Sequence, residues 1–112
     1  MMLIAKLVVA GITLIFGVWV IFAPRKALTL IGMSAEGPRG ITETRVALGA
    51  IYVGSGLACL LLQEPAAFIT LGLTYLVMAL VRAVAIVLDR SADGSNWASL
   101  GLEAVLAVLL LL

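Results

Sequence analysis

The chain has no histidine, a single cysteine and few charged side chains: 7 Lys and Arg with 6 Asp and Glu in 112 residues. Without histidine it lacks the most frequent metal ligand and the most frequent general base. One cysteine, Cys59, allows neither an intrachain disulfide nor a cysteine-based metal cluster, and nothing is present to activate it or Ser99 as a nucleophile. The net charge of +1 lacks the concentrated basic character of nucleic-acid binders. We therefore expect no enzyme, no metal, no cofactor and no nucleic-acid partner.

What the chain does have is apolar sequence. Hydrophobic residues make up 64% of it, and the mean hydropathy of +1.28 lies well above the soluble range. The apolar residues gather in four segments, about 3–23, 41–62, 66–88 and 96–112. A helix needs ~20 residues to cross the hydrocarbon core, whereas four strands cannot close a membrane barrel. The expected fold is an all-α integral membrane four-helix bundle, up-down-up-down, in a single transmembrane domain over residues 1–112.

The loop at 24–40 has features of a short helix at the membrane interface. Pro24 suits a first helical position, Gly32 suits the position after a helix end, and the residues between them are mostly apolar. Arg25, Lys26 and Arg39 would then face lipid headgroups. The alternative is an ordinary basic loop that serves only as a topology signal.

Positive charge is distributed unevenly between the two membrane sides. Arg25, Lys26, Arg39 and Arg90 fall in the loops 24–40 and 89–95, whereas the opposite side offers Lys6 and the amino group. Because basic loops stay in the cytoplasm, these two loops are predicted to be cytoplasmic and both termini to face outward.

Arg82 is the most unusual residue, since it lies in the otherwise uncharged segment 66–88. An unpaired charge inside a bilayer is costly, so Arg82 predicts an intramembrane partner. Arg82 lies seven residues before Asp89, and Glu103 lies seven after Asn96, which puts each about 10 Å below the same loop. The matched depth predicts an ion pair between Arg82 and Glu103.

The third segment has two distinct faces at helical spacing. Tyr75, Arg82 and Asp89 recur every seven residues on a face that also carries Phe68 and Leu71. The opposite face is predicted to meet lipid and consists of Leu73, Leu76, Val77, Leu80, Val84 and Val87.

Further polar residues belong to the same half of the predicted bundle. Glu43 and Arg45 open the second segment, and Asp89 ends the third, so both ends lie on the Arg82 side of the membrane. The hydroxyl of Tyr75 or Tyr52 could complete the network. Two interpretations stay open: the charges fix helix register, or Glu103 is a protonatable or ligand-binding carboxylate tuned by Arg82.

The second segment carries small residues along two edges. Gly49 and Gly56 share one edge with Arg45, Tyr52 and Cys59. The other edge contains Ala50, Gly54 and Ala58, four residues apart, and predicts a helix-packing strip because small side chains let backbones approach. The alternative is a ligand groove floored by Gly49 and Gly56, and both could hold at once.

The order of these elements resembles a known family. It comprises Phe-Ala-Pro-Arg-Lys-Ala-Leu at 22–28, Glu43-Thr-Arg45, Leu-Gly-Ala-Ile-Tyr-Val-Gly-Ser-Gly at 48–56, Arg82, Asp89, Asp93-Gly94 and Glu103. The pattern is similar to an uncharacterised bacterial four-helix membrane family, a domain of unknown function near the DoxX-like proteins. The chain departs from it at 48–50, where a pair of glycines is expected. The resemblance implies the fold, the shared polar positions and a bacterial inner-membrane location, but no activity.

Three functions remain. The first is an accessory or interaction subunit of a larger membrane complex, favoured by the missing catalytic apparatus and the small-residue edges. The second is a membrane binding protein for a quinone, lipid or other amphipathic molecule near Tyr52, Tyr75, Arg82 and Glu103. The third is a small proton-coupled transporter acting as a homo-oligomer, since the chain is similar in size to the small multidrug transporters. Their pattern has an acidic residue in the first helix, whereas this chain has Lys6 there.

Overall fold

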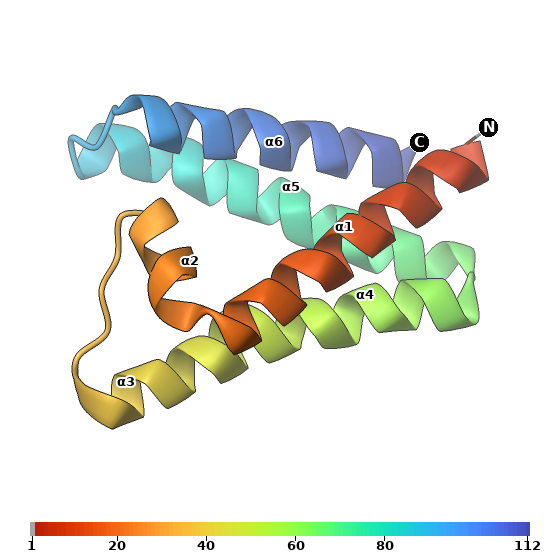
Figure 1. Ribbon diagram of the computed structural model, residues 1–112. Helices are drawn as coiled ribbons and strands as arrows, with labels where there is room; N and C mark the ends of the chain where they lie inside the picture. Colours follow the sequence, from red (N-terminus) through yellow and green to blue (C-terminus); the bar gives the residue numbers. More distant parts are fainter. Residues whose placement is uncertain (1) are drawn as a thin grey trace. The chain divides into compact units, whose positions relative to one another are not determined.

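The computed structural model describes residues 2–112, and these form helices joined by short turns with no strand among them (Figure 1). The all-α prediction is confirmed. In chain order the elements are α1 (Met2–Phe22), α2 (Pro24–Leu30), α3 (Gly37–Glu43), the π-helix η1 (Thr44–Ala50), α4 (Ile51–Leu62), α5 (Pro65–Leu88) and α6 (Gly94–Leu111). The elements α3, η1 and α4 follow one another without a break.

Four stretches of helix are long and apolar enough to cross a membrane: Met2–Phe22, Gly37–Leu62, Pro65–Leu88 and Gly94–Leu111. They agree with the predicted spans except that the second begins four residues before residue 41. The reason is Pro38, which lies in the first turn of α3, where its fixed φ favours the helix and its missing N–H costs nothing. Prolines open α2 and α5 in the same way.

The short helix predicted after the first span is present as α2. Gly32 adopts a φ of +77°, a left-handed conformation that glycine takes without steric cost. The N–H of Gly32 donates to the carbonyl of Thr29, and the N–H of Met33 donates to that of Leu28 at 2.8 Å. This pair of bonds is a Schellman motif, which ends α2 and turns the chain.

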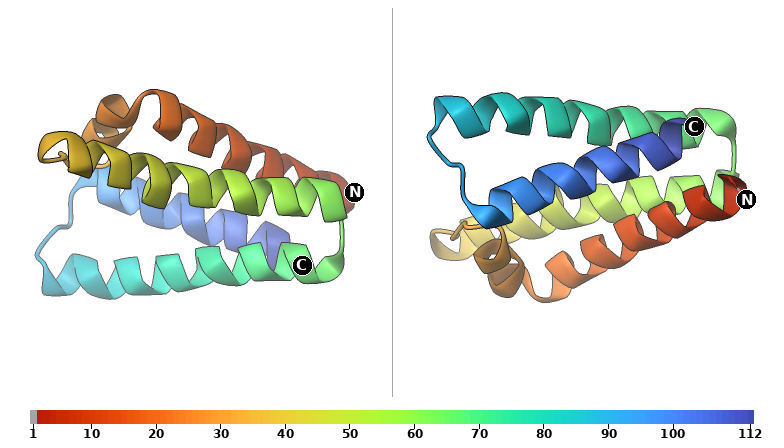
Figure 2. Two further views of the ribbon diagram at one scale, coloured as in Figure 1. Left: turned by 90° about the horizontal axis from the view of Figure 1, so that it is seen from below. Right: turned by 90° about the horizontal axis from the view of Figure 1, so that it is seen from above.

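The chain divides into two compact units, one made of Ala10–Leu62 and the other of Gln63–Leu112 with the first residues of α1. In the first unit, α1 runs antiparallel to η1 and α4 (Figure 2), and glycines allow their backbones to touch. A Cβ on Gly17 would lie 2.7 Å from the carbonyl oxygen of Gly49, and one on Gly56 would lie 2.9 Å from that of Ala10. No other residue type fits there without moving a helix.

The second unit consists mainly of α5 packed antiparallel against α6 (Figure 1). The predicted inner face of α5 is buried at Phe68, Leu71 and Tyr75, and the opposite face is exposed from Leu73 to Val87 as predicted. The residues that α6 buries are Glu103, Leu106, Ala107 and Leu110. Near the far end of this helix pair, a Cβ on Gly72 would lie only 2.9 Å from the Cβ of Leu110. Close packing of α5 and α6 therefore fixes where Arg82 and Glu103 lie.

Candidate functional site

Arg82 of α5 and Glu103 of α6 form a two-pronged ion pair. Nε of Arg82 donates to Oε1 of Glu103 at 2.7 Å, and Nη2 donates to Oε2 at 2.8 Å. The side chain of Glu103 is only 7% exposed, whereas that of Arg82 is 33% exposed. The parallel bonds match the planar guanidinium to the planar carboxylate, which is the strongest geometry available to such a pair. They also tie the register of α5 to that of α6.

Asn96 extends this pair to the loop between the two helices. Nη1 of Arg82 donates to Oδ1 of Asn96 at 2.8 Å. The side-chain nitrogen Nδ2 of Asn96 in turn donates to the backbone carbonyl oxygen and to the hydroxyl of Ser91, at 3.0 and 3.1 Å. The sequence prediction placed Asn96 on the same helix face as Glu103 and at the start of the span, but did not include it among the hydrogen-bond partners. Its position seven residues before Glu103, on the same face of one helix, was the signal that could have placed it in the cluster.

The first turn of α6 is held by Asp93, its N-cap residue. Oδ1 of Asp93 accepts hydrogen bonds from the backbone N–H of Asn96 and from the hydroxyl of Ser95, both at 2.9 Å. These bonds, the Asn96 bond foremost, stabilise the carboxylate and lower the pKa of Asp93 below its ordinary value. Asp93 therefore stays ionised at neutral pH, and this cap fixes the turn that presents Asn96 to Arg82.

Two other predicted members lie on α5. Tyr75 is buried on the inner face, seven residues before Arg82. Asp89 is the C-cap residue of α5 and is exposed. Its backbone N–H donates to the carbonyl of Ala85, which closes the last turn of the helix. Asp89 thus lies at the C-terminal end of the face rather than beside the buried carboxylate.

Glu43 and Arg45 each form a hydrogen bond within the unit Ala10–Leu62, and their predicted part in the Arg82 network stays a prediction. Oε1 of Glu43 accepts from Nε of Arg39 at 3.0 Å, one turn away on α3, in an exposed pair. Nη1 of Arg45 donates to the carbonyl of Ile21 at 2.6 Å. That carbonyl belongs to the last turn of α1, where carbonyls lack intrahelical partners and cations are favoured. Arg45 is therefore the cap of α1.

Two of the small residues predicted to pack helices, Gly49 and Gly56, lie in a close helix contact. Gly49 and Gly56 pack directly on α1, so the groove proposed between them is filled by helix backbone. Tyr52, on the same edge, packs edge-on against Phe16 of α1 with ring centroids 5.3 Å apart. Packing within the chain thus uses the edge that had been considered for a ligand.

The predicted packing strip of Ala50, Gly54 and Ala58 lies on a different edge of the helix from Gly49 and Gly56. Ala50 and Gly54 are exposed, Ala58 is half-buried, and a Cβ on Gly54 would meet nothing within 4 Å. The strip therefore does not pack α1, because consecutive helical residues point about 100° apart and only one edge can meet that neighbour.

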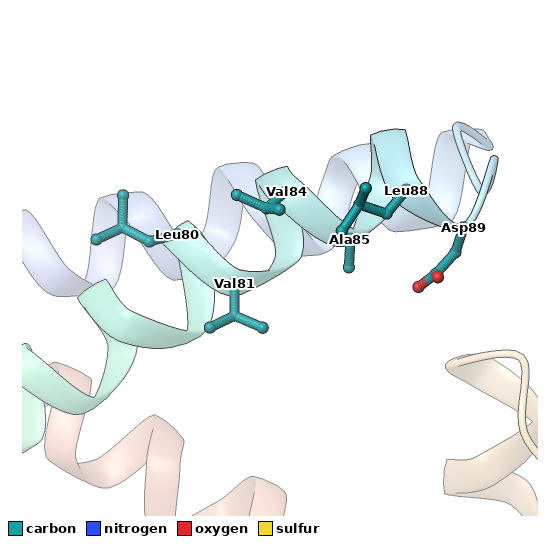
Figure 3. Close-up of a pocket in the computed structure, with 6 residues that line it drawn as sticks. All are labelled: Leu80, Val81, Val84, Ala85, Leu88 and Asp89. Atoms are coloured by element: carbon teal, nitrogen blue, oxygen red, sulfur yellow. The ribbon is translucent and has the colours of Figure 1, made fainter.

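Two shallow apolar hollows lie on the surface of single helices. One, of about 400 Å³, runs along α5 from Leu80 to Asp89, whose carboxylate is its only charged group (Figure 3). The other, of about 250 Å³, is lined by Ala104, Val105, Val108 and Leu109 of α6. Among the residues that the structure describes, no group of three or more Cys, Asp or Glu side chains is placed to hold a metal ion.

Comparison with known proteins gives a family but no relative of known activity. No curated protein and no solved structure matches the chain. One family model, described as a domain of unknown function, matches residues 1–112, the whole chain. The predicted resemblance to an uncharacterised family is thus confirmed, whereas bacterial origin and kinship to DoxX-like proteins stay predictions. The chain, with its four membrane-length helices and its Arg82 and Glu103 pair, belongs to the DUF4345 family.

Proposed function

We propose that this protein is an accessory subunit of a larger membrane-protein complex, and that a partner helix packs against the exposed strip of Ala50 and Gly54. The observation that carries the proposal is the difference between two sets of small residues on one continuous helix. Gly49 and Gly56 are used within the chain, where a side chain would collide with α1. Ala50 and Gly54 are exposed, although small residues four apart are typical of close helix contacts in membranes.

The Arg82 and Glu103 pair has a structural role in this proposal. Inside the bilayer it would lock α5 against α6, so that the chain presents rigid outer faces to a partner. Both carboxylate oxygens of Glu103 accept bonds from Arg82, and Asn96 occupies a third guanidinium nitrogen. Because these hydrogen-bonding atoms all have partners, the arrangement favours a structural ion pair. It disfavours a carboxylate that exchanges protons or ligands, as a transporter would require.

The test is a pair of matched substitutions. Gly54→Leu adds a bulky side chain to the strip, at a position where a Cβ meets nothing of its own chain within 4 Å, and Gly101→Leu does the same on α6. We expect the wild-type protein and Gly101→Leu to retain the same protein subunit when membranes are solubilised gently, and Gly54→Leu to lose it at least tenfold. Native mass spectrometry of the purified samples measures the retained subunit, and circular dichroism checks that helix content is unchanged.

Three results would contradict the proposal. A wild-type protein that carries only a bound quinone or lipid would favour the small-molecule binding function, and a bare homodimer would favour the small transporter. Equal retention of the subunit by both leucine variants would show that the strip is not the contact.

We also propose an orientation in which residues 24–40 and the 89–95 loop are cytoplasmic and both termini face outward, because these two regions carry Arg25, Lys26, Arg39 and Arg90. Cysteines introduced at Ser34 and Ala92, in a Cys59→Ser background, should resist a membrane-impermeant thiol reagent added to intact cells and react after lysis. Labelling of both in intact cells would reverse the orientation.

A further inference from the structure

Residues 24–33, called the α2 segment below, expose two neighbouring cations on a helix whose other side is buried. Arg25 and Lys26 are exposed, whereas Pro24, Ala27 and Leu28 are buried. Burial of that side fixes the orientation of α2, so the two cations point away from the protein. Their direction is thus set by packing and not by free rotation of a loop.

Exposed apolar side chains follow the cations directly. Leu30 is 63% exposed, Ile31 41% and Met33 54%, and the Schellman motif at Gly32 holds them at the end of α2. Cations beside an exposed apolar surface are typical of segments that lie in the lipid headgroup region. There the apolar side chains can enter the acyl boundary while the charges stay among the headgroups.

The other two cations of this part of the chain are already bonded. Arg39 pairs with Glu43, and Arg45 donates to the carbonyl of Ile21. Within the described residues, neither Arg25 nor Lys26 has a carboxylate within ion-pair distance. These two cations therefore have their charge available for an anion outside the protein.

We propose that the α2 segment binds acidic phospholipid, with Arg25 and Lys26 on the headgroup phosphate and with Leu30, Ile31 and Met33 beside the acyl chains. The expected ligand is a lipid rather than a soluble phosphate, because a soluble phosphate would leave the adjacent apolar side chains exposed to water. The site is separate from the Ala50 and Gly54 strip, and it does not depend on the accessory-subunit function.

The experiment uses the purified full-length protein in mixed micelles that contain equal amounts of phosphatidylglycerol and phosphatidylcholine, with native mass spectrometry to count retained lipids. Each basic residue near an acidic surface changes binding on the order of fivefold, so we expect Arg25→Gln/Lys26→Gln to lower the phosphatidylglycerol preference by roughly 25-fold. The matched control is Arg90→Gln, which removes an exposed cation from the other loop. It should leave the preference unchanged.

A second variant separates the headgroup from the acyl contribution. Leu30→Gln/Met33→Gln changes two exposed residues and should weaken retention of both lipids by a similar factor, with the preference between them kept.

The proposal is overturned if the wild-type protein retains both lipids equally. It is also overturned if Arg90→Gln lowers the preference as much as the α2 variant, since the effect would then come from net charge alone. All the changed side chains are exposed, and unchanged helix content by circular dichroism verifies folding.

Discussion

Replacing Arg82 with methionine should lower the free energy of unfolding by about 3 kcal/mol, because it leaves the carboxylate of Glu103 buried and unpaired. Removing one partner of a buried ion pair costs roughly 3–5 kcal/mol. The low end is expected here, since the Arg82 side chain is 33% exposed and water can reach part of the site. The protein in detergent, unfolded by increasing SDS and followed by circular dichroism, gives the measurement.

The double variant Arg82→Met/Glu103→Leu distinguishes an ion pair that only holds α5 against α6 from charges that the function itself requires. Apolar side chains of similar volume often replace a buried pair at little cost, so the double variant should recover most of the stability lost in Arg82→Met. It would also leave the side chain of Asn96 with only its bonds to Ser91, which retain part of the loop contact.

Two outcomes would contradict this account. A loss below about 1 kcal/mol in Arg82→Met would mean that the pair behaves like a solvent-exposed salt bridge. A stable double variant that no longer retains its partner subunit would mean that the charges act outside the helix pair, and the structural role proposed for Glu103 would be wrong.

The second large effect is expected for Gly56→Leu. Its Cβ would lie 2.9 Å from the carbonyl oxygen of Ala10 and the backbone nitrogen of Leu14, so α1 and α4 must separate. Overpacking typically costs ~1–3 kcal/mol, and the upper end is expected because the obstacle is backbone rather than a mobile side chain. The same SDS titration applies.

Gly54→Leu is the internal control, two residues away on the same helix. A Cβ at this position would meet nothing within 4 Å. Glycine is about 0.8–1 kcal/mol less favourable in a helix than alanine, and leucine ranks just below alanine, so this variant should be as stable as the wild type or slightly more stable. The two leucine variants should therefore change stability in opposite directions. Equal destabilisation would show that α1 and α4 do not approach as the structure has them.

Helical periodicity was enough to predict much of α5. Every residue expected on its lipid face, from Leu73 to Val87, is exposed, and Phe68, Leu71 and Tyr75 are buried. The pairing of Arg82 with Glu103 was predictable for a related reason: both lie at the same depth below one short loop, so connectivity restricted the choice of partner.

The same reasoning did not identify the partner of Arg45 or which small residues of the second span meet α1. The carbonyl of Ile21, in the last turn of α1 where carbonyls lack intrahelical partners, accepts from Arg45. Nothing in the amino-acid sequence distinguishes the edge with Gly49 and Gly56 from the edge with Ala50 and Gly54 as the one that meets α1. Both edges consist of small residues at helical spacing.

By itself the sequence determined that this is a membrane-length helical chain, where its spans lie, and that Arg82 needs a partner. Hydrophobic length, composition and the cost of a bare charge in lipid are properties of single segments, which can be read one at a time. Only the tertiary structure decided which glycines touch a neighbouring helix, which carbonyl Arg45 caps and how Asn96 joins the ion pair. Those choices depend on how one helix is rotated and shifted against another, and periodicity within a helix contains no information about its neighbour.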